Sequence, residues 1–226
     1  ARVEFVSANP TGPLHFGNAR GGPIGDSLAA VLEFCGWEVS REYLDNDEGG
    51  QIRQLGQTIA FKLNYFGQSQ ESSEENIDRE LAYKGSYIDE LSTEVSRFVD
   101  NNGGEDLYVM KSSEHIEELC GKIAVQIMHK QIIADCKAMG ISFDRIYKES
   151  ELREKIPVIL KEFQEKGLLK EGGGAVWFAP KDKWFSNRQA VIVKSDQEYT
   201  YFMADIVYHK EKFESGYDLV VDVFGS

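Results

Sequence analysis

The chain has 226 residues, 42% hydrophobic and 28% charged, a composition typical of a soluble globular protein. It contains no apolar run near the roughly 20 residues that a membrane helix needs, and its three widely spaced cysteines form neither a disulfide framework nor a CxxC zinc motif. Most of the net charge of −13 lies between residues 67 and 118, where fourteen residues are acidic and four are basic, so polyanion binding elsewhere is not excluded.

The first 66 residues have the pattern of a β–α–β–α unit. Alternating sequence rich in Val and Phe predicts a strand over residues 2–7. Apolar residues at helical spacing predict a helix over 18–35, and a second strand is expected over 37–44. Acidic and amide side chains at Asp45–Asp47 are typical of a helix N-cap, so we expect the next helix to begin there and to run to about residue 66. This order predicts a parallel sheet with helices on both faces.

Residues 67–113 interrupt this pattern. They are acidic, contain Ser-rich and Asn-Asn-Gly-Gly stretches, and have only short amphipathic pieces. We interpret them as an acidic, mostly helical insertion with marginal helices over 75–81 and 87–101, whose charge lies on a solvated face. A long helix is expected to follow over 114–139, ended by a glycine.

The last part of the chain returns to strands and helices. The expected elements are a strand over 143–147, a helix over 151–166, a hairpin of strands over 175–179 and 190–194, a helix over 204–213 and a strand over 218–224. We expect residues 1–66 and 114–226 to form one α/β domain that the insertion 67–113 divides. Because the sequence opens directly on a strand and ends two residues after another, we interpret it as part of a longer protein.

The turn after the first strand is the first candidate site. In a doubly wound sheet, ligands bind beyond the carboxyl ends of the strands, and the first turn commonly holds a nucleotide. The following helix offers free N–H groups and a positive dipole end, which suits a phosphate. Gly17 would let a flat base lie on the backbone, and His15 could donate to a phosphate oxygen. The alternative is a Gly/Pro-rich turn whose histidine caps a helix.

The residues around this turn resemble a known family. The run Ser7–Asn18 reads SANPTGPLHFGN, and Gly-Asp at 25–26, Gly-Trp at 36–37 and NDEGGQI over 46–52 follow it. Together they closely resemble the start of the arginyl-tRNA synthetase catalytic domain. HFGN corresponds to the HIGH motif of class I synthetases, with Asn18 where most members have histidine. The resemblance implies a Rossmann-like parallel sheet of the HUP type, and it continues through residues 143–150, 199–206 and 222–225.

Arginine recognition makes its own demands on a site. A guanidinium is planar, permanently charged and presents forked donors, so a selective pocket needs more than one carboxylate and a shaped wall. Glu149 and Asp205 would supply the carboxylates and Tyr201 the wall. Taken singly, Glu149 would be a helix-capping acid, Asp205 a surface charge and Tyr201 a core residue. The resemblance implies that Ser7 and Asn9 hold the α-amino end of the substrate.

The resemblance also implies a function. It is the ATP-dependent activation of L-arginine to arginyl-adenylate and transfer of the arginyl group to tRNA(Arg) in the cytoplasm, without membrane or DNA. His15 and Asn18 would act on the phosphates of ATP and Gly17 on its adenine, with Mg²⁺ accompanying ATP and neither zinc nor a protein metal site. No KMSK-like sequence occurs in these residues, so we expect little or no aminoacylation from the chain alone. The alternatives are another class I synthetase, or a non-catalytic synthetase-like module that binds tRNA or a partner.

Overall fold

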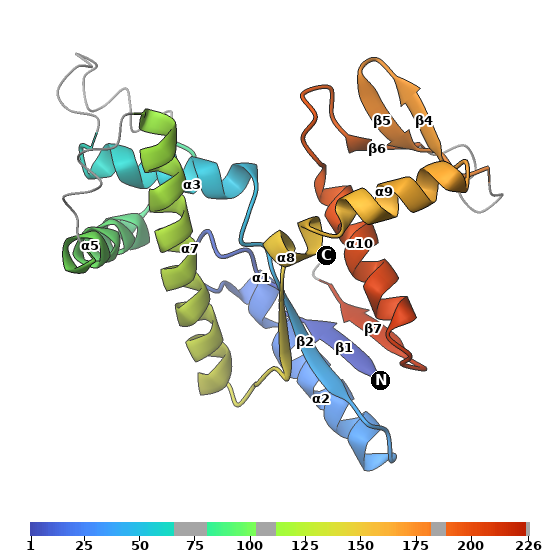
Figure 1. Cartoon of the computed structure of the whole chain (residues 1–226). Helices are drawn as coiled ribbons and strands as arrows, with labels where there is room; N and C mark the ends of the chain where they lie inside the picture. The colour runs from blue at the N-terminus through green and yellow to red at the C-terminus, as the bar shows by residue number, and fades with distance from the viewer. Residues whose placement is uncertain (66–80, 103–111, 182–188, 225–226) are drawn as a thin grey trace.

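The structure is a computed structural model that describes residues 1–65, 81–102, 112–181 and 189–224. A four-stranded sheet lies at its centre, and every neighbouring pair in it is parallel. Its strands, in spatial order, are β3 (Arg145–Lys148), β2 (Ser40–Asp45), β1 (Arg2–Phe5) and β7 (Val220–Val223). The predicted mixed α/β fold with a parallel sheet is therefore confirmed (Figure 1).

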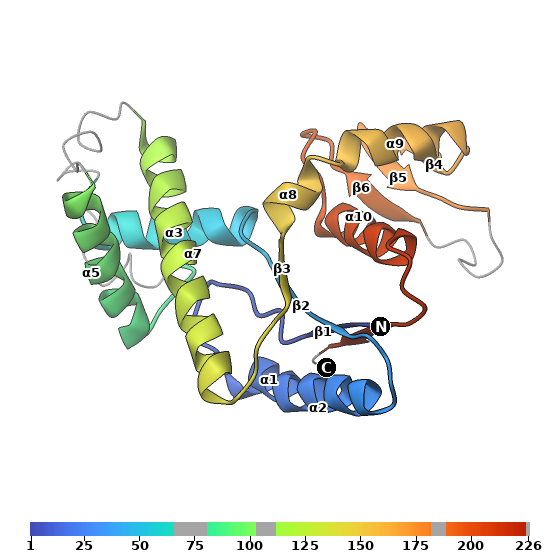
Figure 2. The same ribbon diagram turned by 60° about the horizontal axis from the view of Figure 1, so that its bottom comes forward.

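Helices cover both faces of this sheet, as Figure 2 shows. One face carries α1 (Phe16–Ala19) and α2 (Gly21–Phe34), and the other carries α8 (Glu149–Arg153) and α10 (Tyr201–Glu214). The sequence predicted a single helix over 18–35, and the structure begins it earlier and divides it at Arg20.

The face of the sheet toward α2 is apolar. Val3 and Phe5 of β1 and Tyr43 of β2 have no exposed surface there. A methyl group placed on Gly25 of α2 would lie 2.3 Å from the ring of Phe5. The glycine therefore lets α2 approach the strand closely, which is how this part of the core is closed.

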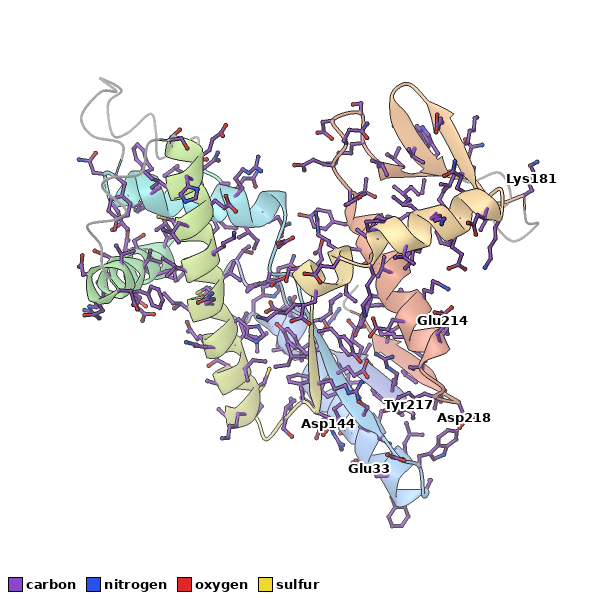
Figure 3. The ribbon with its side chains drawn as sticks, viewed as in Figure 1. Glu33, Asp144, Lys181, Glu214, Tyr217 and Asp218 are labelled. Carbon is purple, nitrogen blue, oxygen red and sulfur yellow. The ribbon has the colours of Figure 1, made fainter. Side chains whose placement is uncertain are left out.

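The opposite face of the sheet carries buried charge. Arg2 of β1 donates from Nε and Nη2 to the carboxylate of Glu42 on β2, each at 2.7 Å, and both side chains are at most 1% exposed. Two aromatic rings cover the guanidinium, Tyr147 at 5.2 Å and Tyr217 at 5.8 Å from ring centroid to Cζ. Figure 3 labels Tyr217 in the turn between α10 and β7. A buried ion pair needs such hydrogen bonds and close partners because removing its charges from water is costly.

Three helices form a second packed unit beside the sheet. They are α3 (Gly50–Lys62), α5 (Ser86–Asn101) and α7 (Ser113–Ala138), seen together on the left of Figure 1. The helices expected over 87–101 and 114–139 are confirmed, but α5 is not marginal. It contributes Ile88, Leu91, Val95 and Val99 to the shared core. The helix expected over 75–81 lies, apart from Leu81, outside the described residues, and the division of the chain at 66 and 113 stays a prediction.

A small antiparallel sheet packs with α9 (Ile156–Glu165), away from the three helices just described (Figure 1). Its order is β4 (Leu169–Gly172), β5 (Ala175–Phe178) and β6 (Ala190–Val193). The predicted hairpin corresponds to β5 and β6, whereas β4 falls in a stretch whose glycines indicated only a turn.

The prediction of one continuous helix over 151–166 is wrong. The structure breaks it between α8 and α9, just before Pro157, because proline has no N–H to donate and its ring clashes with the carbonyl of Arg153 four residues earlier.

Candidate functional site

A cavity of about 590 Å³ opens beyond the carboxyl ends of β1 and β7. The chain leaves β1 to form β2 on one side, while β7 pairs on the other side, so β1 and β7 flank the switch point where ligands of such sheets bind. All eight residues predicted for the site line this cavity: Ser7, Asn9, His15, Gly17, Asn18, Glu149, Tyr201 and Asp205. They come from segments up to 198 residues apart in the sequence, and their individual roles stay predictions.

The HFGN turn forms one wall of the cavity. His15 is exposed and precedes α1, but its side chain makes no capping hydrogen bond in the described structure, so the simple capping alternative does not account for it. A methyl group on Gly17 would lie 2.9 Å from Cε1 of His15, so the glycine also leaves space for this ring. The backbone N–H of Asn18 donates to the carbonyl of His15 at 3.0 Å, and Asn18 also lines the cavity.

Asn9 is held by two amides that sequence reasoning did not select. Its Nδ2 donates to Oε1 of Gln51 at 3.0 Å, and Nδ2 of Asn46 donates to its Oδ1 at 2.5 Å. Both partners line the cavity. The signal for them was present, because both lie in the NDEGGQI run that carried part of the family resemblance.

Ser7 occupies a strained turn at the end of β1. Val6 and Ser7 have φ angles of +70° and +36°, a region that a β-branched residue such as valine rarely adopts. The hydroxyl of Ser7 donates to Oε1 of Glu4 at 2.7 Å and accepts from the N–H of Leu44 at 3.0 Å. Strain of this kind persists only where surrounding contacts hold it, and it is concentrated at functional sites.

Glu149 is a buried carboxylate that lines the cavity, with 2% of its surface exposed. Both of its bonds to Arg153, from Nε at 3.2 Å and Nη2 at 2.9 Å, use Oε1 and neither uses Oε2. Burial raises the pKa of Glu149, and the bonds to Arg153 oppose that rise.

Asp47 fixes the helix that carries Glu149. Its carboxylate accepts from the N–H of Ser150 at 2.9 Å and from the hydroxyl of Ser150 at 2.7 Å. The sequence predicted that Asp45–Asp47 would cap the next helix in the chain, which is wrong, because α3 begins later at Gly50 with no side-chain cap. Asp47 instead binds the first turn of α8, about a hundred residues away, where its charge also suits the helix dipole.

The first turn of α10 supplies another wall of the cavity. Tyr201 and Asp205 are four residues apart, and the helix begins at Tyr201, so both side chains lie on one face as expected. Thr200 caps this end by accepting from the N–H of Met203 at 3.4 Å. Asp205 is accessible from the cavity, and the surrounding protein raises its pKa by desolvation against the opposing charge of His209.

Comparisons with known proteins identify the family to which the chain belongs. Residues 2–225 match the family model described as tRNA synthetases class I (R), catalytic domain. The chain belongs to this family. It is 38% identical to the arginine–tRNA ligase of Desulfosudis oleivorans and 39% identical to that of Syntrophotalea carbinolica, in each case over its whole length. A solved arginyl-tRNA synthetase structure from Campylobacter jejuni superposes with a TM-score of 0.77 at 32% identity, over 98% of this chain and 46% of that one.

Membership of the arginyl-tRNA synthetase family confirms the resemblance found in the sequence. The chain spans 39% of the length of these curated relatives, so what it does as a whole protein is a matter for proposal. Two further observations concern the described residues. They contain no group of three or more His, Cys, Asp or Glu side chains placed to hold a metal ion, and no helix of theirs is long and apolar enough to cross a membrane.

Proposed function

We propose that the chain forms the arginine and ATP half-sites of an arginine–tRNA ligase. One observation carries this proposal: two carboxylates from distant helices, Glu149 of α8 and Asp205 of α10, share a cavity with the HFGN turn. A nucleotide motif alone fits many enzymes, and a carboxylate pair alone fits many cations. Their combination suits an enzyme that joins a cationic amino acid to a nucleotide.

The chemistry requires positioning above all. The carboxylate of arginine attacks the α-phosphorus of ATP in line, which gives arginyl-adenylate and releases pyrophosphate. The arginyl group then passes to a hydroxyl of the terminal adenosine of tRNA(Arg), and AMP leaves. His15 and Asn18 would donate to the phosphates as charge develops, Gly17 would lie against the adenine, and no covalent enzyme intermediate is needed. Ser7 and Asn9 would hold the α-amino group.

Recognition of the side chain falls to the other end of the cavity. Glu149 and Asp205 would accept from the forked guanidinium donors and Tyr201 would form the wall beside them. Lysine carries a compact ammonium in place of the planar fork, so it would not reproduce the bonds of a guanidinium to two carboxylates placed for one. Acceptors left without a donor are an expensive defect where water is excluded.

The partners follow from the same proposal. They are L-arginine, ATP and tRNA(Arg), in the cytoplasm. Mg²⁺ would accompany the phosphates of ATP. Residues 1–66 and 114–226 would form the catalytic domain around the insertion 67–113.

Calorimetry with arginine, lysine and cysteine tests the proposal on this chain. We expect arginine to bind at least about 100-fold more tightly than lysine, because only the planar guanidinium presents forked donors in the geometry proposed for the two carboxylates. Cysteine has no side-chain cation and should give no detectable binding. Equal affinity for lysine and arginine, or no heat with arginine at millimolar concentration, would contradict the proposed specificity.

Arginine affinity should depend on pH because the site must be ionised to bind a guanidinium. Burial raises the pKa of both Glu149 and Asp205 above ordinary carboxyl values. Affinity is therefore full at neutral pH and falls as the pH drops through those raised values, above the usual carboxyl range of about 4. Each carboxyl that must lose a proton weakens binding about tenfold per pH unit. Titrations from pH 7.5 downward should approach two protons released in the original chain and one in Asp205→Asn; a flat profile would count against both carboxylates.

A further inference from the structure

Lys212 of α10 is a lysine with no exposed surface. Its ammonium group donates to Glu4 of β1 and to Asp222 of β7, and it lies 4.1 Å from the ring centroid of Tyr208. One helix is thereby joined to two neighbouring strands of the parallel sheet. A buried ammonium is costly unless it is fully paired, so this position is specified by its partners and not by packing alone.

The side chains of α10 divide the helix between two neighbours. Met203 and Val207 lie in an apolar cluster with residues of α9 and β6. Tyr201, Asp205, Tyr208 and Lys212 follow one another at intervals of four, three and four residues, which places them in one stripe along the helix. The first two reach the cavity, and Lys212 reaches the sheet. Apolar packing therefore joins α10 to the small sheet, while Lys212 joins it to the strands that end at the cavity.

The contact with Glu4 continues into the site. Glu4 uses Oε2 for Lys212 and Oε1 for the hydroxyl of Ser7, and it lines the cavity itself. Ser7 in turn accepts from the N–H of Leu44 at the end of β2. Ser7 has the left-handed backbone described above, so it depends on such contacts to keep its place.

We propose that Lys212 is a positioning residue for the arginine site, fixing Tyr201 and Asp205 on α10 relative to Ser7 on the sheet. What the site binds rests on the proposed function. The distance between the two ends of the arginine pocket is then set by the bonds from one ammonium to Glu4 and Asp222. An error of about 1 Å in such a distance is enough to lose much of the affinity of a positioned ligand.

The test compares Lys212→Met with Lys210→Met in the whole chain. Lys210 is on the same helix, and its ion pairs in the described part of the chain are with Glu162 of α9 and Glu214 of α10. We expect Lys212→Met to weaken arginine binding at least tenfold in calorimetry and to leave ATP affinity within twofold. Lys210→Met should change neither. Unfolding alone would lower the bound fraction for both ligands, so the difference between arginine and ATP reports position.

A double variant separates position from stability. Lys212→Met leaves two carboxylates without their cation, and adding Glu4→Gln restores the net charge of the cluster but not the bridge. We expect the melting temperature to recover in the double variant while arginine affinity stays weak. Recovery of both together would overturn the proposal, because Lys212 would then only stabilise the fold.

Amide hydrogen exchange at Leu44 supplies a measurement that needs no arginine. Its N–H donates to Ser7, so release of Ser7 in Lys212→Met should speed its exchange at least tenfold over Lys210→Met. Unchanged exchange would overturn the proposal, as would faster exchange with unchanged arginine affinity. If the original chain bound no arginine, the proposed function would fail, and Leu44 exchange would still decide whether Lys212 holds Ser7.

Discussion

Replacing Gly56 with alanine should strongly destabilise the chain. A methyl group at this position in α3 would lie 1.9 Å from the carbonyl oxygen of Glu117 and 2.8 Å from the amide nitrogen of Gly121, both backbone atoms of α7. Backbone atoms cannot rotate away as a side chain can, so the two helices must separate. That movement would open the core around Leu55 and Ile59, which have no exposed surface. We expect a loss of about 3 kcal/mol or more in the free energy of unfolding.

Urea unfolding of Gly56→Ala measures this loss, with Gly50→Ala as the matched control. Gly50 is the first residue of the same helix, is exposed, and has open space where its methyl group would lie. Its replacement should be neutral or slightly stabilising, since alanine favours helix more than glycine. A Gly56→Ala midpoint within 0.3 M urea (roughly 0.5 kcal/mol at ordinary slopes) of the control would show that α3 and α7 can part without cost.

The crossing of α3 and α7 illustrates what the sequence alone does not contain. Helical periodicity predicts that both helices exist, because it depends on residues within a few turns. It does not say that Gly56 meets Gly121, which lies 65 positions later. A glycine inside a helix reads only as a local weakness until its neighbour is known. The same reason explains why Asp47 was assigned to the wrong helix, since a capping side chain carries no sign of which N-terminus it will reach.

The candidate site was more accessible to sequence reasoning than its surroundings. The strand–turn–helix order placed His15 and Gly17 at a strand end, and parallel sheets bring such ends together. The charge and shape of a guanidinium then required paired carboxylates, and the resemblance assigned them to Glu149 and Asp205. The supporting contacts, such as Lys212 with Glu4, could not be found this way. A lysine in a helix is normally solvated, and only the fold shows that this one is buried between two strands.

The largest effect on arginine binding is expected from Glu149→Gln. Both Glu149 and Asp205 are proposed to accept from the guanidinium, but Glu149 is 2% exposed while Asp205 is open to the cavity. A charge pair is stronger where water is excluded, so removing the buried charge should cost more. Glutamine keeps the shape of the side chain, but it leaves Arg153 facing a neutral amide. Arg153 would then be an unneutralised cation near the incoming guanidinium. We therefore expect arginine affinity to fall at least about 100-fold, near 3 kcal/mol.

Glu151→Gln is the control for this variant, because Glu151 is an exposed carboxylate on the same short helix. It removes the same charge from α8 without touching the cavity, and it should leave arginine affinity within about twofold. Lysine binding offers a second comparison. A single ammonium can rely on Asp205 alone, so Glu149→Gln should narrow the preference for arginine over lysine as well as weaken arginine. Arginine affinity within threefold of the original chain would remove Glu149 from the site and leave Asp205 as the only carboxylate of the proposed pair.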